Sequence, residues 1–361
     1  MLVRLLEQAP AGWDARMAFP TLATTFAEAS RALGFRPLYA EDGASRALVL
    51  MRGLSAPVIG PWTRRAKVNV ESTDVAFATE LVKVIRRSSP ALVRWGDHYW
   101  PPAPAVLDEC PGMRPVVRHI IEQDLTRDED ALFRGMKDEI RRKIRRASKD
   151  GVVVSEVASD ADLRDYCRLS QATNGRMEAQ GQAAIYPDAF FAEVFRRMVP
   201  AGHAVLLLAR SEGIPLAAGM FLLGREWITY CHGASTRDRA LTVKQGPTAM
   251  FWHAMRLGKI RGLTRFSMGS VTPTEDPAHP HYSVYAFKRM WGGTLSEMTS
   301  GEIVLSRLKL AFQDRVLSPL WERAYPIYLH GVKAADVKRV LRSALPGLET
   351  RIFRRLARQR S

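Results

Sequence analysis

The sequence predicts a mixed α/β (α+β) protein made of two halves with the same order of elements. Amphipathic helical segments and short apolar segments alternate through the first 150 residues, and the same alternation returns after residue 150. No residue-level repeat accompanies it, so the halves share an architecture only. After residue 304 the chain becomes helical and basic. We therefore predict domains at residues 1–150 and 151–304, and a basic helical C-terminal extension, 305–361, packed on the first domain.

The composition is that of a soluble globular protein with a large positive charge. The 361 residues include 53 Lys and Arg against 37 Asp and Glu, a net charge of +16. This surplus favours a polyanionic partner such as nucleic acid, anionic lipid or a phosphorylated substrate, the alternative being a solvated basic surface. Cys110, Cys167 and Cys231 lack paired spacing, which fits a reducing compartment. No apolar run reaches the roughly 18 residues of a membrane span, so we expect a cytoplasmic protein, with peripheral contact at the inner face of the membrane as the alternative.

The first half begins with a helix and a strand pair. Phe26–Gly34 has helical spacing and stops at a glycine, and the Glu41–Gly43 turn lets the next two strands pair. A proline-rich stretch at 99–112 predicts a loop. The remaining expected elements are strands at Pro37–Ala40, Ala47–Met51, Ala91–Arg94 and Val116–Asp124, and a helix at Phe77–Arg86.

One long basic helix is expected at Asp128–Lys149. Its apolar residues keep the 3–4 spacing of a helix packed on one face, so its cations must cover the other faces. A block of this density indicates either a solvated surface or a binding site for RNA or another anion. The candidate RNA- or anion-binding residues are Arg141, Arg142, Arg145 and Arg146.

The second half repeats the alternation of elements. Gly151 ends the basic helix and a strand resumes at Val152–Val157. A Gly-rich loop is expected at Gly175–Ala184, where Arg176 reads as a loop cation. The other expected elements are helices at Asp160–Thr173, Pro187–Met198 and Thr248–Leu257, and strands at His203–Arg210, Ile214–Leu223 and Glu226–Cys231.

The start of the helix at Thr248–Leu257 is a candidate anion site. Gly246 and Pro247 precede it, so free backbone N–H groups point outward, and Lys244 adds positive charge. The pattern predicts a phosphate or carboxylate site, although many helices begin this way without a ligand.

The stretch 282–293 places Lys288 and Arg289 among aromatic and sulphur side chains, followed by Gly292-Gly293. A charge among bulky apolar groups is unfavourable without a partner. Lys288 therefore either points to solvent beside an aromatic face or lies in a cleft that faces an anion.

Other kinds of site are disfavoured. His279 and His281 lie in a proline-bearing loop without helical ligand spacing, so no metal site is expected. No elbow motif surrounds a serine, and no cysteine has a suggestive neighbour. The C-terminal residues 351–360 alternate arginines with Ile352, Phe353 and Leu356, which indicates a flexible tail or a segment lying on anionic lipid.

In this order the segments resemble the FemABX family of bacterial non-ribosomal peptidyltransferases, which are built from two GNAT-like acyltransferase domains. The resemblance covers nearly the whole chain. It rests on Phe26–Gly34, Glu139–Val154, Gly213–Ala218, Tyr230–Ser235 (Tyr-Cys-His-Gly-Ala-Ser), Pro247–Gly258 and Tyr285–Lys288 (Tyr-Ala-Phe-Lys).

The resemblance implies transfer of an aminoacyl group from aminoacyl-tRNA to an amino group, classically on a peptidoglycan precursor, with no cofactor. It makes Lys288 the catalytic candidate, as a fixed ammonium where negative charge develops. The expected substrate contacts are Phe287, Arg176, Tyr230, Lys244 and Tyr285. The implied partners are aminoacyl-tRNA and an anionic or amine-bearing acceptor.

The chain departs from the family pattern at two places. Phe266–Ser270 keeps one glycine where an aspartate and two glycines are usual, and Glu28 stands where a basic acceptor contact is expected. Both departures concern the cell-wall acceptor.

Two other functions stay open. One is an acyl-coenzyme A-dependent GNAT enzyme, for which Arg239–Gly246 imitates the pyrophosphate loop only loosely. The other is a non-catalytic RNA- or membrane-binding protein. The general base is unassigned, since His232 reads equally as a core residue, Asp97 is a candidate by residue type alone, and a ribose hydroxyl could relay the proton.

Overall fold

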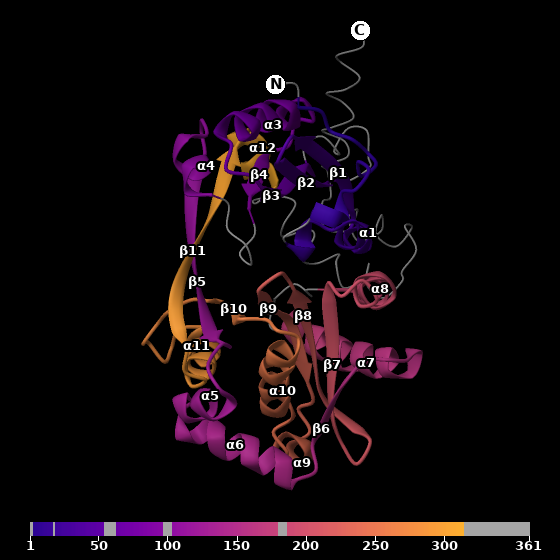
Figure 1. Cartoon of the computed structure of the whole chain (residues 1–361), viewed down its shortest axis with the longest axis vertical. Helices are drawn as coiled ribbons and strands as arrows, with labels where there is room; N and C mark the ends of the chain where they lie inside the picture. Colours follow the sequence, from indigo (N-terminus) through magenta and orange to yellow (C-terminus); the bar gives the residue numbers. More distant parts are fainter. Residues whose placement is uncertain (1–2, 17–18, 54–62, 97–102, 180–185, 314–361) are drawn as a thin grey trace, which may run out of the picture.

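Two lobes share one continuous β-sheet (Figure 1). The computed structural model describes residues 3–16, 19–53, 63–96, 103–179 and 186–313. Within these residues the sheet has 11 strands in the order β1-β2-β3-β4-β11-β5-β10-β9-β8-β7-β6. The strands are β1 Phe35–Asp42, β2 Ser45–Arg52, β3 Arg65–Glu71, β4 Leu92–Trp95, β5 Arg114–Asp124, β6 Val153–Glu156, β7 Ala204–Ser211, β8 Ile214–Leu223, β9 Trp227–Ser235, β10 Arg265–Val271 and β11 Thr294–Val304.

The N-terminal lobe contains β1 to β4. The strands and helices predicted there are confirmed. The β1–β2 hairpin closes at Gly43, whose φ of +57° suits glycine. Asp74 caps helix α3 by accepting from the backbone N–H groups of Ala76 and Phe77. The other helices of this lobe are η1 Asp14–Arg16, η2 Pro20–Leu22, α1 Thr24–Arg31, α3 Val75–Arg87, α4 Pro104–Glu109 and α12 Arg307–Phe312.

The predicted loop at 99–112 is wrong in part. Helix α4 begins at Pro104, a position where proline loses no helical hydrogen bond. Val106 and Leu107 of this helix are buried. The packing of these two side chains therefore favours a helix here, although the composition is rich in proline.

Strands β5 and β11 run from one lobe to the other (Figure 1). They pair antiparallel from Thr294–Glu122 to Glu302–Arg114, while the end of β11 also pairs with β4 and the end of β5 with β10. One two-stranded ribbon therefore carries the hydrogen bonding across the junction.

The C-terminal lobe packs helices on both faces of its strands. Along β7, Val205 and Leu207 face the core cluster that includes α10, while Leu206 and Leu208 face the cluster that includes α8. Burial on both faces explains why β7 and β8 are continuous apolar runs. The helices of this lobe are α5 Glu129–Gly135, α6 Asp138–Lys149, α7 Asp160–Ala179, α8 Asp188–Glu193, the π-helix η3 Val194–Met198, α9 Arg239–Thr242, α10 Gly246–Ile260 and α11 Tyr282–Arg289.

The single basic helix predicted at 128–149 is wrong, because the segment forms two helices. Met136 and Lys137 are extended, with ψ angles of 152° and 147°. Met136 is buried, and the N–H of Lys137 donates to the carbonyl of Met290 at 2.8 Å. The N–H of Lys137 is therefore bonded to a residue distant in sequence and does not form the hydrogen bond that a continuous helix would require.

The predicted Gly-rich loop at 175–184 is also wrong in its first part. Helix α7 continues through Gly175 and Arg176 to Ala179, and residues 180–185 lie outside the described part of the chain. Asn174 explains the extension, since its side-chain amide donates to the carbonyl of Tyr186 at 3.1 Å. Arg176 is thus a helical residue and not a loop cation.

Helix α1 joins the lobes a second time. Ala29 is fully buried within the cluster of the C-terminal lobe that includes Phe190 and Phe191. The hydroxyl of Thr25 lies 2.7 Å from Nδ1 of His203, the residue before β7. The two lobes are therefore held together by packing as well as by the sheet.

Helices α5 and α6 pack with the second lobe, since Leu132 and Ile140 share a core with β7 and α10. The domain boundary near residue 150 stays a prediction, and a division by packing would fall within β5. Of the C-terminal extension, α12 contacts the first lobe through Lys309, whose Nζ donates to the carbonyl of Ser89 at 3.0 Å. The proposed lipid-binding tail at 351–360 lies outside the described residues.

Candidate functional site

The predicted catalytic residue Lys288 lies on α11 and is only 7% exposed. Its ammonium donates to the carbonyl of Ser270 at 2.9 Å and lies 5.7 Å from the ring centroid of Tyr230. No ion pair of Lys288 with a carboxylate occurs among the described residues, and burial lowers the pKa of Lys288 to about 8. The solvent-facing alternative is therefore excluded by the geometry, and the lysine is a buried cation held by a carbonyl and a π face.

The niche around Lys288 forms where β9 and β10 separate. These parallel strands pair only from Arg265–Trp227 to Ser267–Thr229. The register of β10 against β5 then shifts between Ser267 and Ser270, and this bulge turns the carbonyl of Ser270 toward Lys288. The ammonium consequently sits at the point where the two strands diverge.

Gly269 is required inside this bulge. Its φ is +75°, and a Cβ at this position would lie 2.8 Å from the carbonyl oxygen of Tyr230. Sequence reasoning noted Gly269 only as a departure from a family pattern and missed Ser270. The available signal was an isolated glycine near the end of an apolar strand, which often marks a bulge.

The end of α11 is fixed by backbone contacts. Gln123 of β5 donates from Nε2 to the carbonyl of Trp291 at 2.9 Å. Gly292 and Gly293 have positive φ, and a Cβ on either would lie within 2.5 Å of a carbonyl oxygen, that of Gly135 or Glu122. The Gly-Gly pair thus lets α11 lie against α5 and β5, which holds Lys288 in place.

A cationic cavity of about 190 Å³ adjoins this niche at the N-terminus of α10. Phe287, the neighbour of Lys288, lines it and lies 5.9 Å from Phe251 between ring centroids. The charged lining residues are Arg237 and Lys143, and no carboxylate lines the cavity, although the ammonium of Lys143 donates to Glu139 at 2.6 Å. The complete lining is Lys143, Leu216, Ser235, Thr236, Arg237, Leu241, Thr242, Gln245, Gly246, Pro247, Thr248 and Phe287. Backbone N–H groups and two cations make this a place for an anion.

Arg176 lies at the edge of the cavity. It donates to the carbonyl of Ser235 at 3.0 Å and to the hydroxyl of Thr173 at 2.8 Å. Burial, and then the charge of Arg237, lower the pKa of Arg176. Lys143 and Arg237 were missed from the sequence, because only the fold brings α6 and the end of β9 together.

Two predicted substrate contacts point elsewhere. Lys244 does not line the cavity: its Nζ donates to the hydroxyl of Ser211 at 3.0 Å and lies 3.6 Å from the carboxylate of Glu212. Tyr285 is 7% exposed and belongs to the core, with the guanidinium of Arg289 over its ring. Tyr230 does lie in the niche, and burial raises its pKa.

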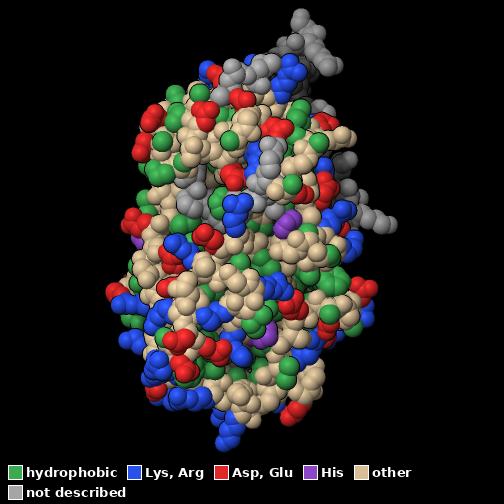
Figure 2. Space-filling model, viewed as in Figure 1, with side chains coloured by type: hydrophobic (Ala, Val, Ile, Leu, Met, Phe, Trp, Pro, Cys, Tyr) green, Lys and Arg blue, Asp and Glu red, His purple; other side chains and the backbone are tan. Residues whose placement is uncertain are grey.

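The four arginines predicted to bind RNA lie on α6, outside the cavity. Arg142 bonds Asp138, Arg146 bonds Asp150 at 2.6 Å, and Arg141 lies 3.4 Å from Asp138. Arg145 instead stacks on Phe133 at 5.3 Å. On the face shown in Figure 2, Lys and Arg side chains are interspersed with Asp and Glu over the lower lobe. The basic segment is thus a charged surface in which carboxylates neutralise several of the arginines.

His232 is a core residue in this structure. A register shift in β9 places it on the opposite face from Tyr230, where its Nδ1 lies 3.1 Å from the hydroxyl of Tyr166. Burial lowers the pKa of His232 to about 4. It therefore has no access to the Lys288 niche, and Asp97, the other candidate base, lies outside the described residues.

His279 and His281 lie close together, but no group of three metal-binding side chains occurs in the described part of the chain. None of the described helices combines the length and apolarity needed to cross a bilayer.

Residues 134–289 match the family described as acetyltransferase (GNAT) domain. These bounds include the cavity, the niche and Lys288. No curated protein matches the sequence.

Several solved structures share the fold over most of the chain. FemX is 14% identical with a TM-score of 0.62, covering 81% of this chain and 93% of its own. L-PGS from Bacillus licheniformis is 13% identical with a TM-score of 0.57, covering 88% and 98%. The C-terminal domain of a putative lysylphosphatidylglycerol synthetase from Agrobacterium fabrum is 12% identical with a TM-score of 0.52, covering 80% and 92%. The predicted tandem GNAT-like architecture is confirmed, and the chain has an acyltransferase fold like that of FemX.

Proposed function

We propose that this protein transfers an aminoacyl group from aminoacyl-tRNA to the amino group of a small acceptor, forming an amide bond. The observation that carries the proposal is the buried ammonium of Lys288, which has a carbonyl and a π face as partners and adjoins a cationic cavity. Removing a cation from water costs free energy unless the cation interacts with an anion. FemX and L-PGS, whose folds are similar, support the acyl-transfer class.

The chemistry requires one bond to form and one to break. The acceptor nitrogen attacks the ester carbonyl carbon, the C–O bond to the ribose breaks, and the proton lost by nitrogen passes to the departing ribose oxygen. Lys288 would stabilise the negative charge that develops on the carbonyl oxygen or the neighbouring phosphate. A preorganised donor in a dry site is worth about 10²–10³ in turnover.

The remaining site residues have supporting roles in this proposal. Arg176, Arg237 and Lys143 would neutralise phosphates at the 3′ end of the tRNA, next to the N-terminus of α10. Phe287 and Tyr230 would flank the reacting end, since both lie beside Lys288. The arginines of α6 would add contacts with the RNA backbone farther from the reacting ester.

A second candidate donor is acyl-coenzyme A. The cavity at the N-terminus of α10 favours it, because a pyrophosphate would fit the same N–H groups and cations. Lys288 argues against acyl-coenzyme A and for aminoacyl-tRNA, because its fixed charge fills the gap between β9 and β10.

The test supplies the purified protein with tRNA charged with radiolabelled amino acids, together with a small-molecule and lipid extract. We expect label in an RNase-resistant product, whose mass identifies the acceptor. Transfer from labelled acyl-coenzyme A alone would establish the second donor. No transfer from either donor, with RNA binding intact, would indicate a binding protein.

The variant Lys288→Met isolates the role of the ammonium. We expect turnover to fall about 10²–10³-fold while the affinity for tRNA changes little. The matched control is Lys259→Met, because Lys259 also donates to a main-chain carbonyl, that of Leu125 at 2.7 Å, and lines no cavity described here. Loss of tRNA affinity with turnover preserved at saturation would show that Lys288 acts in binding alone.

A further inference from the structure

A buried polar network lies across the sheet from the Lys288 niche, between β9 and α7. His232 of β9 is 3% exposed. Its Nδ1 lies 3.1 Å from the hydroxyl of Tyr166, and its Nε2 lies 3.4 Å from the hydroxyl of Ser170. Tyr166 and Ser170 are one turn apart on α7, and neither has any exposed surface. The reaction as described above does not use this network.

The ring of His232 is fixed in both position and orientation. Each ring nitrogen has a hydroxyl partner, which suits a neutral imidazole, since one nitrogen donates and the other accepts. Burial lowers the pKa of His232 to about 4, so the ring is neutral at pH 7. Phe191 of α8 packs against it with 4.9 Å between ring centroids. Two helices therefore hold this residue of β9 in place.

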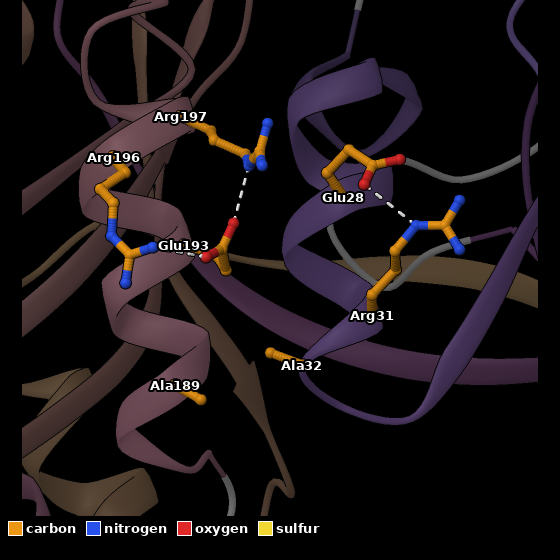
Figure 3. A pocket seen from close by; sticks show the side chains of 7 residues that line it. All are labelled: Glu28, Arg31, Ala32, Ala189, Glu193, Arg196 and Arg197. Atoms are coloured by element: carbon orange, nitrogen blue, oxygen red, sulfur yellow. Dashed lines mark hydrogen bonds and ion pairs between the residues drawn. The ribbon is translucent and has the colours of Figure 1, made fainter.

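The ion pairs between α1 and the α8–η3 segment offer a contrast (Figure 3). There Glu28 bonds Arg31, and Glu193 bonds Arg196 and Arg197, each within its own helix. The three arginine side chains are 49–65% exposed. Exposed pairs of this kind contribute little to a fixed geometry, whereas a buried and satisfied network rigidifies the main chain that carries it.

Strand β9 contains a bulge at Cys231. Adjacent residues of β8 pair with Tyr230 and His232, so Cys231 is the extra residue between them. In a regular strand, residues 230 and 232 would face the same side of the sheet. The bulge instead turns Tyr230 toward Lys288 and His232 toward α7.

Gly233 connects the position of His232 to the ring of Tyr230. A Cβ on Gly233 would lie 2.0 Å from the hydroxyl oxygen of Tyr230, so the phenol lies directly against the main chain that follows His232. The other contacts of this ring are Phe251, at 4.7 Å between centroids, and the ammonium of Lys288, at 5.7 Å from the centroid. Movement of the main chain at 232–233 would therefore displace the ring against Lys288.

We propose that His232 is a positioning residue for the transfer reaction: its hydrogen bonds to α7 hold the β9 bulge, and the bulge holds Tyr230 against Lys288. His232 lies on the opposite face of the sheet from the niche, so it acts through Tyr230 alone. The expected effect on turnover rests on the proposed function. The expected effect on Lys288 itself does not depend on which donor the protein uses.

The first experiment measures the pKa of Lys288 by NMR on protein with ¹³C-labelled lysine, with the signal assigned by its absence in Lys288→Met. In Tyr166→Phe we expect this pKa to rise toward 10.5 by about half a pH unit or more, because a displaced Tyr230 admits water. Asn69→Ala is the control. It removes another buried hydrogen bond, from Nδ2 to the carbonyl of Thr21 at 2.7 Å in the N-terminal lobe, and should leave the pKa unchanged. A pKa that does not rise in Tyr166→Phe would overturn the proposal.

The variant Gly233→Ala tests the same connection from its other end. Its added methyl group would push the phenol of Tyr230 away, and we expect a similar rise in the pKa of Lys288. Gly175→Ala is the matched control, because a Cβ on this glycine of α7 would meet nothing within 4 Å. An unchanged pKa in Gly233→Ala would show that Tyr230 does not transmit the position of His232, and would also overturn the proposal.

The final experiment separates positioning from a general loss of stability. In Tyr166→Phe we expect turnover at saturation to fall about three- to tenfold with an unchanged KM. In the Lys288→Met background the same substitution should cost less than about twofold, because no ammonium remains to be positioned. Equal falls in both backgrounds would show a merely structural role. Absence of transfer by the unmodified protein would contradict the proposed function alone, and the pKa of Lys288 would still decide whether His232 positions it.

Discussion

At the scale of single residues, the main feature is Lys288, a buried lysine with no carboxylate partner in the part of the chain that the structure describes. Lys288 gives up most of its hydration and gains a single carbonyl at 2.9 Å and the face of Tyr230. Such an arrangement destabilises the charged folded form, so it persists where the charge serves a ligand. The same burial offers a direct physical test.

We predict that stability increases with pH between about 8 and 10.5 because of Lys288. The pKa falls from 10.5 to about 8 on folding, so in this interval the unfolded chain binds more protons than the folded chain. The penalty of burying the ammonium is complete below pH 8 and is relieved as the pH rises, by an amount of about 3 kcal/mol. Urea unfolding at several pH values measures it.

In Lys288→Met this increase should disappear, and the variant should be at least as stable as the unmodified protein at pH 7. The surface variant Lys83→Met, at a position 62% exposed, should keep the increase. A Lys288→Met protein that is several kcal/mol less stable at pH 7 would contradict the assignment of a buried, uncompensated charge.

The sequence indicated Lys288 and Phe287, because a cation inside an apolar block is unusual and the block resembled a family motif. It gave no indication of Ser270, whose contribution is a main-chain carbonyl, or of Arg237, which reaches the cavity only after β9 is placed beside α10. Tyr285 and Lys244 show the opposite case, because the motifs include them but the structure places their side chains away from the cavity. A motif names neighbours in sequence, but side-chain direction depends on the helix and turn that hold them.

At the scale of elements, the β10 bulge positions the catalytic candidate. It turns the carbonyl of Ser270 toward Lys288 and lets β10 approach Tyr230 through Gly269. Residues 266–270 are therefore more than a strand of the core, because their irregularity sets the geometry of the niche.

We predict that Gly269→Ala lowers stability by about 2–4 kcal/mol and turnover by about tenfold or more. The alanine would have a strained φ and a Cβ 2.8 Å from the carbonyl oxygen of Tyr230. Gly262→Ala is the matched control, since Gly262 has a φ of +71° with nothing within 4 Å. It should lose only about 1 kcal/mol, with turnover unchanged. Equal effects of the two variants on turnover would show that the bulge is unimportant.

The basic helix α6 allows a graded prediction about RNA. Arg145→Gln should weaken tRNA binding more than Arg146→Gln, because Arg145 stacks on Phe133 while Arg146 is already paired with Asp150. Binding measured across a potassium chloride series should show a salt slope smaller by about 1 for Arg145→Gln. Equal losses for the two variants would indicate that the ion pair opens freely, and no loss for either would remove α6 from the RNA surface.

Helix and strand positions were largely predictable where the apolar pattern was clear, as in the continuous apolar runs of β7 and β8 and the helical spacing of α10. The errors occurred where a distant contact overrides local preference. Lys137 donates to Met290 and interrupts the basic helix, and Asn174 bonds Tyr186 and carries α7 past Gly175. No local pattern encodes a partner more than 100 residues away, so the break at Lys137 could not be inferred.

At the scale of the whole molecule, the lobes behave as one unit because two connections join them. The β5–β11 ribbon continues the sheet across the junction, and α1 buries Ala29 in the core of the C-terminal lobe. The ribbon also holds the Lys288 niche in place, because its strand β5 pairs with β10, which carries Ser270.

We predict that the described region unfolds in one cooperative transition, and that Ala29→Arg lowers its Tm by roughly 5 °C or more. The arginine would place a charge in a site with no exposed surface. Ala76→Arg, at an exposed alanine, should change the Tm by about 1 °C or less. Differential scanning calorimetry compares them, and an unchanged Tm in Ala29→Arg would mean that the lobes separate easily.

The ribbon also limits how the protein can be divided for study. A recombinant fragment cut at residues 134 and 289 would keep α10, α11 and Lys288 but lose β5 and β11. One edge of β10 would then have unpaired backbone groups, which promote aggregation, and Trp291 and its bond to Gln123 would be gone. A fragment suitable for expression must therefore begin before β5 and end after β11, although both strands lie outside the region that matches the GNAT family.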